Sequence, residues 1–175
     1  GGLGGHGGVS RGRAGEAGAA ARRVGPAGGR AVVVQGGRTG LGGGASAGAG
    51  EVALSLDRMT AISAVDRTAG ALTAEAGATL GNVQAAAVAE ELFYAVDLGA
   101  RGTAAIGGTI ATNAGGIRVV RYGMTREQVL GLDVVLADGT ILSDMSGVVK
   151  HHTGDHLQQL LSLRHIRTCR RLYAI

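Results

Sequence analysis

The sequence has very few of the residues on which several protein classes depend. It contains one cysteine, one proline, no tryptophan and only four aromatic residues among 175. A single cysteine, Cys169, excludes an internal disulfide framework and a cysteine-rich zinc site. No apolar run approaches the ~18 residues that a membrane-spanning helix needs, so we expect no membrane span. With so few rings to stack on bases, a nucleic-acid module that works by stacking is also disfavoured.

The net charge of +4 is unevenly distributed along the chain. Residues 1–30 contain five Arg and one Glu, and residues 163–175 contain four Arg and no acid. Between them, residues 31–162 contain seven Arg and one Lys but twelve acids. Because a nucleic-acid-binding domain carries its positive charge on the folded face, the acidic middle argues against a nucleic-acid partner.

Both ends differ from the middle in composition. Residues 1–30 contain twelve glycines and almost no large apolar residue, which predicts a flexible leader. This segment has no apolar stretch of the kind found in secretory signals, so we expect a cytoplasmic protein. Residues 163–175 form a divergent, Arg-rich tail, and we expect one or both ends to be truncated or out of frame.

Apolar patterning in the middle predicts short strands and one helix. The strands are expected at residues 31–35, 52–56, 62–65, 71–76, 129–137 and 141–142. Thr79 can cap a helix that runs to about Glu90, and its apolar face would contain Leu80, Val83, Ala87 and Val88. Asp138-Gly139 lies between two apolar runs and predicts a hairpin. This mixture favours an α+β fold over a doubly wound sheet.

The first segment with chemical content is a glycine-rich run at residues 36–44, Gly-Gly-Arg-Thr-Gly-Leu-Gly-Gly-Gly. Glycines let backbone N–H groups converge on an anion, while Arg38 and Thr39 add donors suited to phosphate oxygens. The run has no Lys, which excludes a Walker loop. It leads into a strand rather than a helix, which excludes a Rossmann loop. We therefore predict a phosphate-binding loop, with a plain flexible turn as the alternative.

The second segment covers residues 97–116 and is apolar, with small hydroxyl and amide groups at intervals. Gly107-Gly108 would allow a flat ligand to lie against the backbone. Asn113 can both donate and accept hydrogen bonds, which suits a ring with both kinds of edge. The alternative is a tightly packed, glycine-rich structural segment.

In this order and spacing, the two segments resemble the FAD-binding domain of the FAD-linked oxidases, the PCMH-type or vanillyl-alcohol-oxidase-like fold. The resemblance continues through Arg118, Arg121-Tyr122-Gly123 and residues 129–140, and it covers roughly residues 31–162. The most similar subgroup is the D-2-hydroxyacid dehydrogenases, which include D-lactate dehydrogenase, the FAD subunit of glycolate oxidase and D-2-hydroxyglutarate dehydrogenase. MurB-like reductases share the flavin fold, but their second segment is less similar.

The resemblance implies two α/β lobes, at about residues 31–90 and 91–162, with FAD between them and the domain incomplete at its C-terminus. In that family the first loop holds the FAD pyrophosphate, which implies roles for Gly37, Arg38, Thr39, Gly40, Leu41, Gly43 and Gly44. The second segment lines the pyrophosphate and the isoalloxazine ring, which implies Leu98, Gly99, Gly107, Gly108, Thr112, Asn113 and Gly116. Some relatives attach FAD covalently through a His in the first loop. This loop contains none, so noncovalent FAD is expected.

The implied activity is oxidation of a small D-2-hydroxy acid by hydride transfer to FAD, with the electrons passing to an acceptor that the sequence does not identify. Relatives bind substrate in a cap domain that this chain lacks, and the family's segment after Lys150 reads differently here, as His151-His152-Thr153-Gly154-Asp155. The alternative is therefore a catalytically inactive, flavin-binding fragment.

No residue of the chain is assigned a catalytic or metal-binding role. A metal site at His151, His152 and His156 is disfavoured, because these residues lie at a predicted junction between a loop and a helix. The acids Asp97, Asp133 and Asp138 are expected at turns or strand ends, since no paired-carboxylate spacing stands out. Two arginines, Arg118 and Arg121, either attract a carboxylate substrate or are structural.

Overall fold

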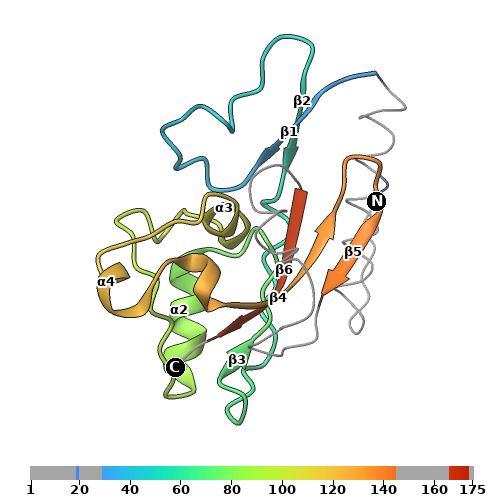
Figure 1. Ribbon diagram of the computed structural model, residues 1–175. Coiled ribbons are helices and arrows are strands. Elements are labelled where there is room, and N and C mark those ends of the chain that lie inside the picture. The colour runs from blue at the N-terminus through green and yellow to red at the C-terminus, as the bar shows by residue number, and fades with distance from the viewer. Residues whose placement is uncertain (1–18, 20–28, 145–165, 174–175) are drawn as a thin grey trace.

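The computed structural model describes residue 19, residues 29–144 and residues 166–173. Its strands form two sheets, and helices gather on one side of the larger sheet (Figure 1). The smaller sheet pairs β1 (Val32–Gln35) with β2 (Val52–Ser55) in parallel. The larger, antiparallel sheet has the order β3 (Ala71–Leu72), β6 (Ile166–Tyr173), β4 (Val129–Val135) and β5 (Ile141–Asp144). This mixture of sheets and helices confirms the α+β class.

The predicted strands at residues 31–35 and 52–56 are confirmed as β1 and β2. Their pairing continues beyond the strands at both ends, because Val52 N–H donates to the Ala31 carbonyl at 2.8 Å and Leu56 N–H donates to that of Gln35 at 2.9 Å. Residues 36–51 connect the two strands without a helix. The glycine-rich run therefore leads from strand to strand, as expected.

The predicted strands at residues 62–65 and 71–76 are wrong in extent. They are joined by the isolated Ile62–Ala74 bridge and by a hydrogen bond from Ser63 N–H to the Thr73 carbonyl at 2.8 Å, and the second strand is limited to β3. A side chain interrupts the ladder, because Thr73 N–H donates to the Ser63 hydroxyl at 3.1 Å rather than to a carbonyl. Serine competes for backbone donors in this way, and apolar alternation does not reveal it.

Helix α2 (Leu80–Ala89) confirms the predicted helix and its cap. The Thr79 hydroxyl accepts a hydrogen bond from Asn82 N–H at 3.3 Å, which satisfies one N-terminal donor that has no partner inside the helix. Leu80, Val83 and Ala87 are fully buried. The prediction was wrong for Val88, which is 65% exposed because the buried face is narrower than the sequence pattern suggests.

Strands β4 and β5 form the predicted hairpin, with Val135 opposite Ile141 as the last pair. Gly139 adopts a φ of 80° in the connection, which glycine tolerates without a steric penalty. Strand β4 is buried on both faces, so the expected alternation is absent. Val134 packs in the main core, while Val135 contacts apolar residues of β1 and β2.

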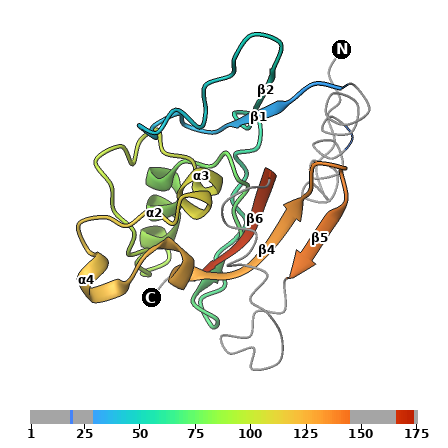
Figure 2. The same cartoon turned by 45° about the horizontal axis from the view of Figure 1, so that its top comes forward.

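The central position of β6 was not predicted. Its residues belong to the segment interpreted as a divergent tail, yet they pair with β3 on one side and β4 on the other. Four arginines in residues 163–175 hide any apolar pattern there. Figure 2 shows the sheet that β6 completes. The domain boundaries predicted from the sequence remain predictions.

The main core lies between α2, β4 and a second helix, α3 (Ile106–Ala111). Its largest fully buried side chains include Tyr94, Leu80 and Ile106. Two shorter elements follow α3, namely α4 (Val119–Tyr122) and the 3-10 turn η2 (Thr125–Gln128). Because Ile106 and Ile110 are buried in this core, α3 is held with its other face toward the glycine-rich loop.

The cap of α2 provides a test of this fold. We expect Thr79→Ala to lower the free energy of unfolding by about 1 kcal/mol, the usual cost of losing such a cap. Urea denaturation followed by circular dichroism measures it. The control is Thr60→Ala, since Thr60 is exposed. Equal stability of the two variants would contradict the capping role.

Candidate functional site

The loop after β1 presents backbone donors and one cation. Within the described residues, no N–H group of residues 37–44 donates a hydrogen bond to another part of the chain. Arg38 is exposed and has a φ of 53°, in the left-handed region that costs a non-glycine residue about 1–2 kcal/mol. Strain of this kind concentrates at ligand-binding sites. The loop therefore combines unused backbone donors with one positively charged residue, Arg38, whose backbone is strained.

Helix α3 gives the second segment its shape. It follows Ala105, which has extended backbone angles, and Ile106 and Ile110 anchor one side in the core. On this helix the hydroxyl of Thr109 donates to the Ile106 carbonyl at 2.8 Å. That of Thr112 donates to the Gly108 carbonyl at 2.9 Å. With their protons used inside the helix, both hydroxyl oxygens still have accepting lone pairs.

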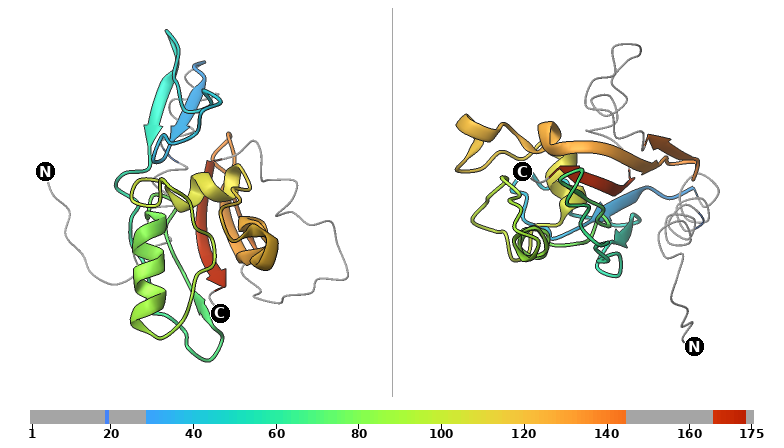
Figure 3. Two further views of the ribbon diagram at one scale, coloured as in Figure 1. Left: turned by 90° about the vertical axis from the view of Figure 1, so that its left-hand side faces the viewer. Right: turned by 90° about the horizontal axis from the view of Figure 1, so that it is seen from below.

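The two glycine-rich segments meet at backbone distance. A Cβ atom added to Gly37 would lie 1.7 Å from the carbonyl oxygen of Thr103. One added to Gly36 would lie 2.9 Å from Cβ of Ala105. Only glycine permits the first of these contacts. Figure 3 shows the loop after β1 lying over α3.

Together the segments border a half-open cavity of about 440 Å³. This volume falls within the ~300–1,000 Å³ typical of small-molecule sites. Of its lining residues in the described part of the chain, only Arg38 is charged. Several glycines on its wall, among them Gly40, Gly42 and Gly108, have open space where a side chain would lie. The cavity is thus a mostly apolar space with a single cation at its rim.

Eight of the residues predicted from the sequence line this cavity. They are Gly37, Arg38, Thr39, Gly40, Gly44, Leu98, Gly108 and Thr112. Their convergence from two distant segments supports one common site. Their contacts with a ligand remain predictions.

The other six predicted residues do not line the cavity. Leu41, Gly43 and Gly99 are exposed beside it, and Leu41 is 104% exposed. Gly107 packs against Ala76, where a Cβ atom would come within 2.7 Å of the alanine methyl group.

Asn113 and Gly116 have structural contacts. The side-chain oxygen Oδ1 of Asn113 accepts a hydrogen bond from Arg126 N–H at 3.0 Å, and the φ of Asn113 is 47°. Gly116 lies against the backbone of Asp97. The side-chain amide of Asn113 therefore does not line the cavity.

Sequence reasoning missed eight lining residues: Val34, Gly36, Gly42, Ala45, Ala105, Thr109, Ala111 and Ala114. The sequence contained a pattern from which some of these residues could have been found. Residues 105, 108, 109 and 112 follow a helical repeat, so assigning α3 would have placed Ala105 and Thr109 beside Gly108 and Thr112.

The remaining candidate residues have structural surroundings. Arg118 pairs with Asp97, and Arg121 stacks over the Tyr122 ring at 5.1 Å. Asp133 accepts a hydrogen bond from the Ser143 hydroxyl within the hairpin. Asp138 accepts one from Thr140 N–H in the β4–β5 turn at 2.8 Å.

No cluster of three metal-binding side chains occurs among the described residues. His151, His152 and His156 lie outside them. In the same part of the chain, no helix has the length and apolar character needed to cross a membrane.

Comparison with known proteins shows the family of this chain. A family model described as "FAD binding domain" matches residues 14–144. A D-2-hydroxyglutarate dehydrogenase of Xanthomonas citri pv. viticola is 52% identical over 134 residues, which is 75% of this chain and 28% of the relative. A mitochondrial D-2-hydroxyglutarate dehydrogenase of Danio rerio is 45% identical over 130 residues, or 74% of this chain and 24% of the relative. The chain thus spans about a quarter of the length of these relatives.

Solved structures support the same fold. A Phl p 4 variant, described as a glucose oxidase, superposes with a TM-score of 0.75 at 19% identity, covering 93% of this chain and 33% of that one. An alkyldihydroxyacetonephosphate synthase gives 0.73 at 15% identity, covering 84% of this chain and 27% of that one. These likenesses concern the fold alone, and they confirm the PCMH-type architecture.

The contact between the two segments can be tested with neighbouring glycines. We expect Gly37→Ala to lower the free energy of unfolding by about 1–3 kcal/mol, the usual cost of overpacking. The matched control is Gly40→Ala in the same loop, where an added Cβ atom meets nothing within 4 Å. Urea titration of both variants measures the difference. If both were equally stable, the close approach would not matter to the fold.

Proposed function

The chain belongs to the FAD-binding-domain family, and from this we propose that it forms the FAD-binding portion of a flavin-dependent oxidoreductase that oxidises a D-2-hydroxy acid. The observation that carries the proposal is the cavity between the two glycine-rich segments. Relatives of 52% and 45% identity named D-2-hydroxyglutarate dehydrogenase favour a hydroxy diacid as the substrate.

The first glycine-rich loop suits a pyrophosphate. Among the described residues its N–H groups donate to nothing outside the loop, so an anion would not have to displace bonds to the rest of the fold. Arg38 adds a permanent positive charge with several donors. We propose that residues 37–40 and Gly44 hold the two phosphate groups.

The opposite wall suits a flat aromatic ring. Leu98, Ala105 and Gly108 supply apolar contact, and the missing side chain at Gly108 leaves space above the first turn of α3. The hydroxyl oxygens of Thr109 and Thr112 can accept hydrogen bonds from a ring edge. We propose that this wall contacts the isoalloxazine ring.

When bound, FAD supplies the two-electron acceptor for oxidising the carbon that bears the hydroxyl group. This chain's own residues bind the cofactor, orient it and exclude water from one side. Arg118 is already paired with Asp97. We therefore assign substrate recognition to parts of the longer enzyme rather than to this arginine.

A second candidate is a flavin-binding fragment without turnover. The observation that favours it is length, because the chain corresponds to only 28% and 24% of two dehydrogenase relatives. Under this reading FAD binds the isolated chain but is not reduced by added D-2-hydroxy acid. Cytoplasmic location also stays a prediction, and several relatives, including that of Danio rerio, are named as mitochondrial.

Cofactor retention tests the proposal directly. We expect the purified chain, after incubation with FAD and desalting, to keep a flavin absorption spectrum. Denaturation in acid should then release the flavin into the supernatant, because the first loop has no His for a covalent bond. A folded chain that keeps no flavin would contradict the proposed function, and flavin that precipitates with the protein would contradict noncovalent binding.

The role of Arg38 can be separated from general charge. We expect Arg38→Ala to raise the Kd for FAD about tenfold or more, since a hydrogen bond to a charged group contributes about 1.5–3 kcal/mol. Quenching of flavin fluorescence measures the Kd. The control is Arg67→Ala, which removes an exposed ion pair with Glu90 and Glu91, none of which lines the cavity. If both variants bound FAD equally, Arg38 would have no specific role.

A further inference from the structure

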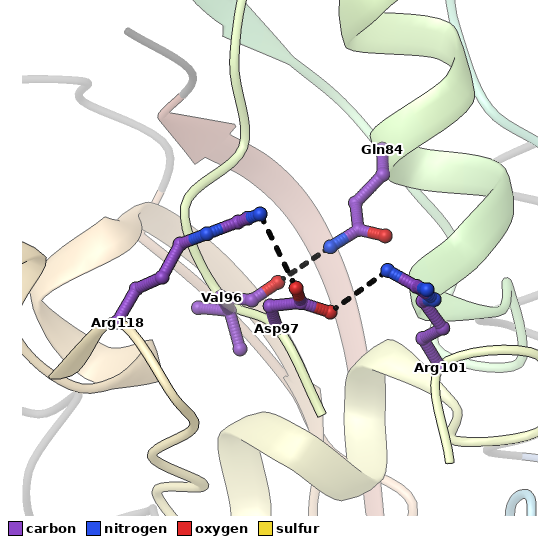
Figure 4. Close-up of polar contacts among 5 residues, drawn as sticks. All are labelled: Gln84, Val96, Asp97, Arg101 and Arg118. Atoms are coloured by element: carbon purple, nitrogen blue, oxygen red, sulfur yellow. Dashed lines mark hydrogen bonds and ion pairs between the residues drawn. The ribbon is translucent and has the colours of Figure 1, made fainter. Parts of the chain in front are cut away.

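A buried carboxylate lies directly before the cavity wall. Asp97 has a side chain only 7% exposed, and its two oxygens pair with two arginines (Figure 4). Nη1 of Arg101 lies 3.3 Å from Oδ1, and Nη2 of Arg118 lies 3.3 Å from Oδ2. A buried charge is tolerated only when it is paired in this way. Asp97 therefore links its own loop to the residues at the start of α4.

The backbone of Asp97 makes the same link a second time. Its carbonyl oxygen accepts a hydrogen bond from Ile117 N–H at 3.1 Å. A Cβ atom at Gly116 would lie 2.2 Å from that oxygen, so the two backbones touch. Side chain and main chain together hold the loop against residues 116–118.

Helix α2 holds the same loop from the other side. Nε2 of Gln84 donates to the Val96 carbonyl at 2.8 Å (Figure 4). Gly81 N–H donates to the Arg101 carbonyl, also at 2.8 Å. Residues 96–101 are thus clamped between α2 and the turn before α4.

The clamped loop continues into the cavity wall. Leu98, next to Asp97, lines the cavity, and Thr103 supplies the carbonyl that touches Gly37. A displacement of residues 97–104 would therefore move one wall and the contact with the first loop together. The two arginines are 60% and 36% exposed, so water could solvate both guanidinium groups without Asp97. The arginines therefore do not depend on Asp97 for solvation, whereas the buried carboxylate depends on them, and the pairing fixes the position of the loop.

We propose that Asp97 is a positioning residue, which with Arg101 and Arg118 holds residues 97–104 in the shape that receives the ligand. The inference rests on the proposed function, because the ligand meant is FAD. Asp97 does not line the cavity, so its effect passes through Leu98 and Thr103. The wall is then in place before the cofactor arrives, which reduces the entropy lost on binding.

The test compares two buried aspartates. Asp133 is 3% exposed and accepts a hydrogen bond from Ser143, but it lies in the β4–β5 hairpin and does not line the cavity. We would measure Tm, the Kd for FAD and amide hydrogen exchange of the FAD-free full chain for Asp97→Asn and Asp133→Asn. Both variants should lose thermal stability. Only Asp97→Asn should raise the Kd, by about tenfold, which equals 1.4 kcal/mol, and speed exchange at residues 98–104.

A second pair of variants covers the case in which Asp97→Asn does not fold. Arg101→Gln and Arg67→Gln each remove an exposed arginine from an ion pair, and the two side chains are similarly exposed at 60% and 58%. Arg101→Gln should weaken FAD binding and speed exchange at residues 98–104, whereas Arg67→Gln should change neither.

The outcomes separate the clamp from the proposed function. A Kd for Asp97→Asn within about twofold of that for Asp133→Asn would overturn the positioning role. Unchanged exchange at residues 98–104 would overturn it as well. If the wild-type chain binds no FAD, the proposed function fails, and the exchange comparison alone decides whether Asp97 holds the wall.

Discussion

The contact on which the candidate site depends is the approach of Gly37 to the carbonyl oxygen of Thr103, at a distance that leaves no room for a Cβ atom. It joins two segments more than sixty residues apart in the sequence. Because the contact is between backbones, the space beside it is shaped by the main chain and by small residues. Such a site depends on the paths of two loops, and any force that fixes those paths also fixes the cavity.

The parts of the fold that could be predicted are those with local causes. Strand β1 is a short apolar run before glycines, and α2 has a cap and an apolar face, so each was located from its own residues. The errors in the predicted strands arise where a residue's hydrogen-bond or strand partner lies far away in the sequence. The Ser63 hydroxyl takes the N–H of Thr73 and shortens a strand, while β6 becomes central only because β3 and β4 lie on its two sides.

The candidate site was predicted in outline for a different reason. A loop rich in glycine, with Arg38 and Thr39 inside it, favours binding of an anion over a plain flexible turn, so its residue types predicted the chemistry that we propose. The cavity neighbours Ala105 and Thr109 were missed because the helix that carries them was not assigned. The ion pair of Asp97 with Arg118 could not be predicted, since Arg118 lies on another element and no spacing in the sequence relates the two.

The chemistry available to this chain follows from the same construction. A wall of backbone and small side chains offers donors and shape, and the described residues place no carboxylate, imidazole, amine or thiol in the cavity lining. The only lining charge, on Arg38, is permanent and cannot exchange protons near neutral pH. A site of this composition is suited to binding and orienting a cofactor whose own chemistry is complete, as proposed above. Under the proposed function, proton transfer and substrate selection would fall to residues outside this cavity. The two relatives are about four times as long as the stretch they share with this chain.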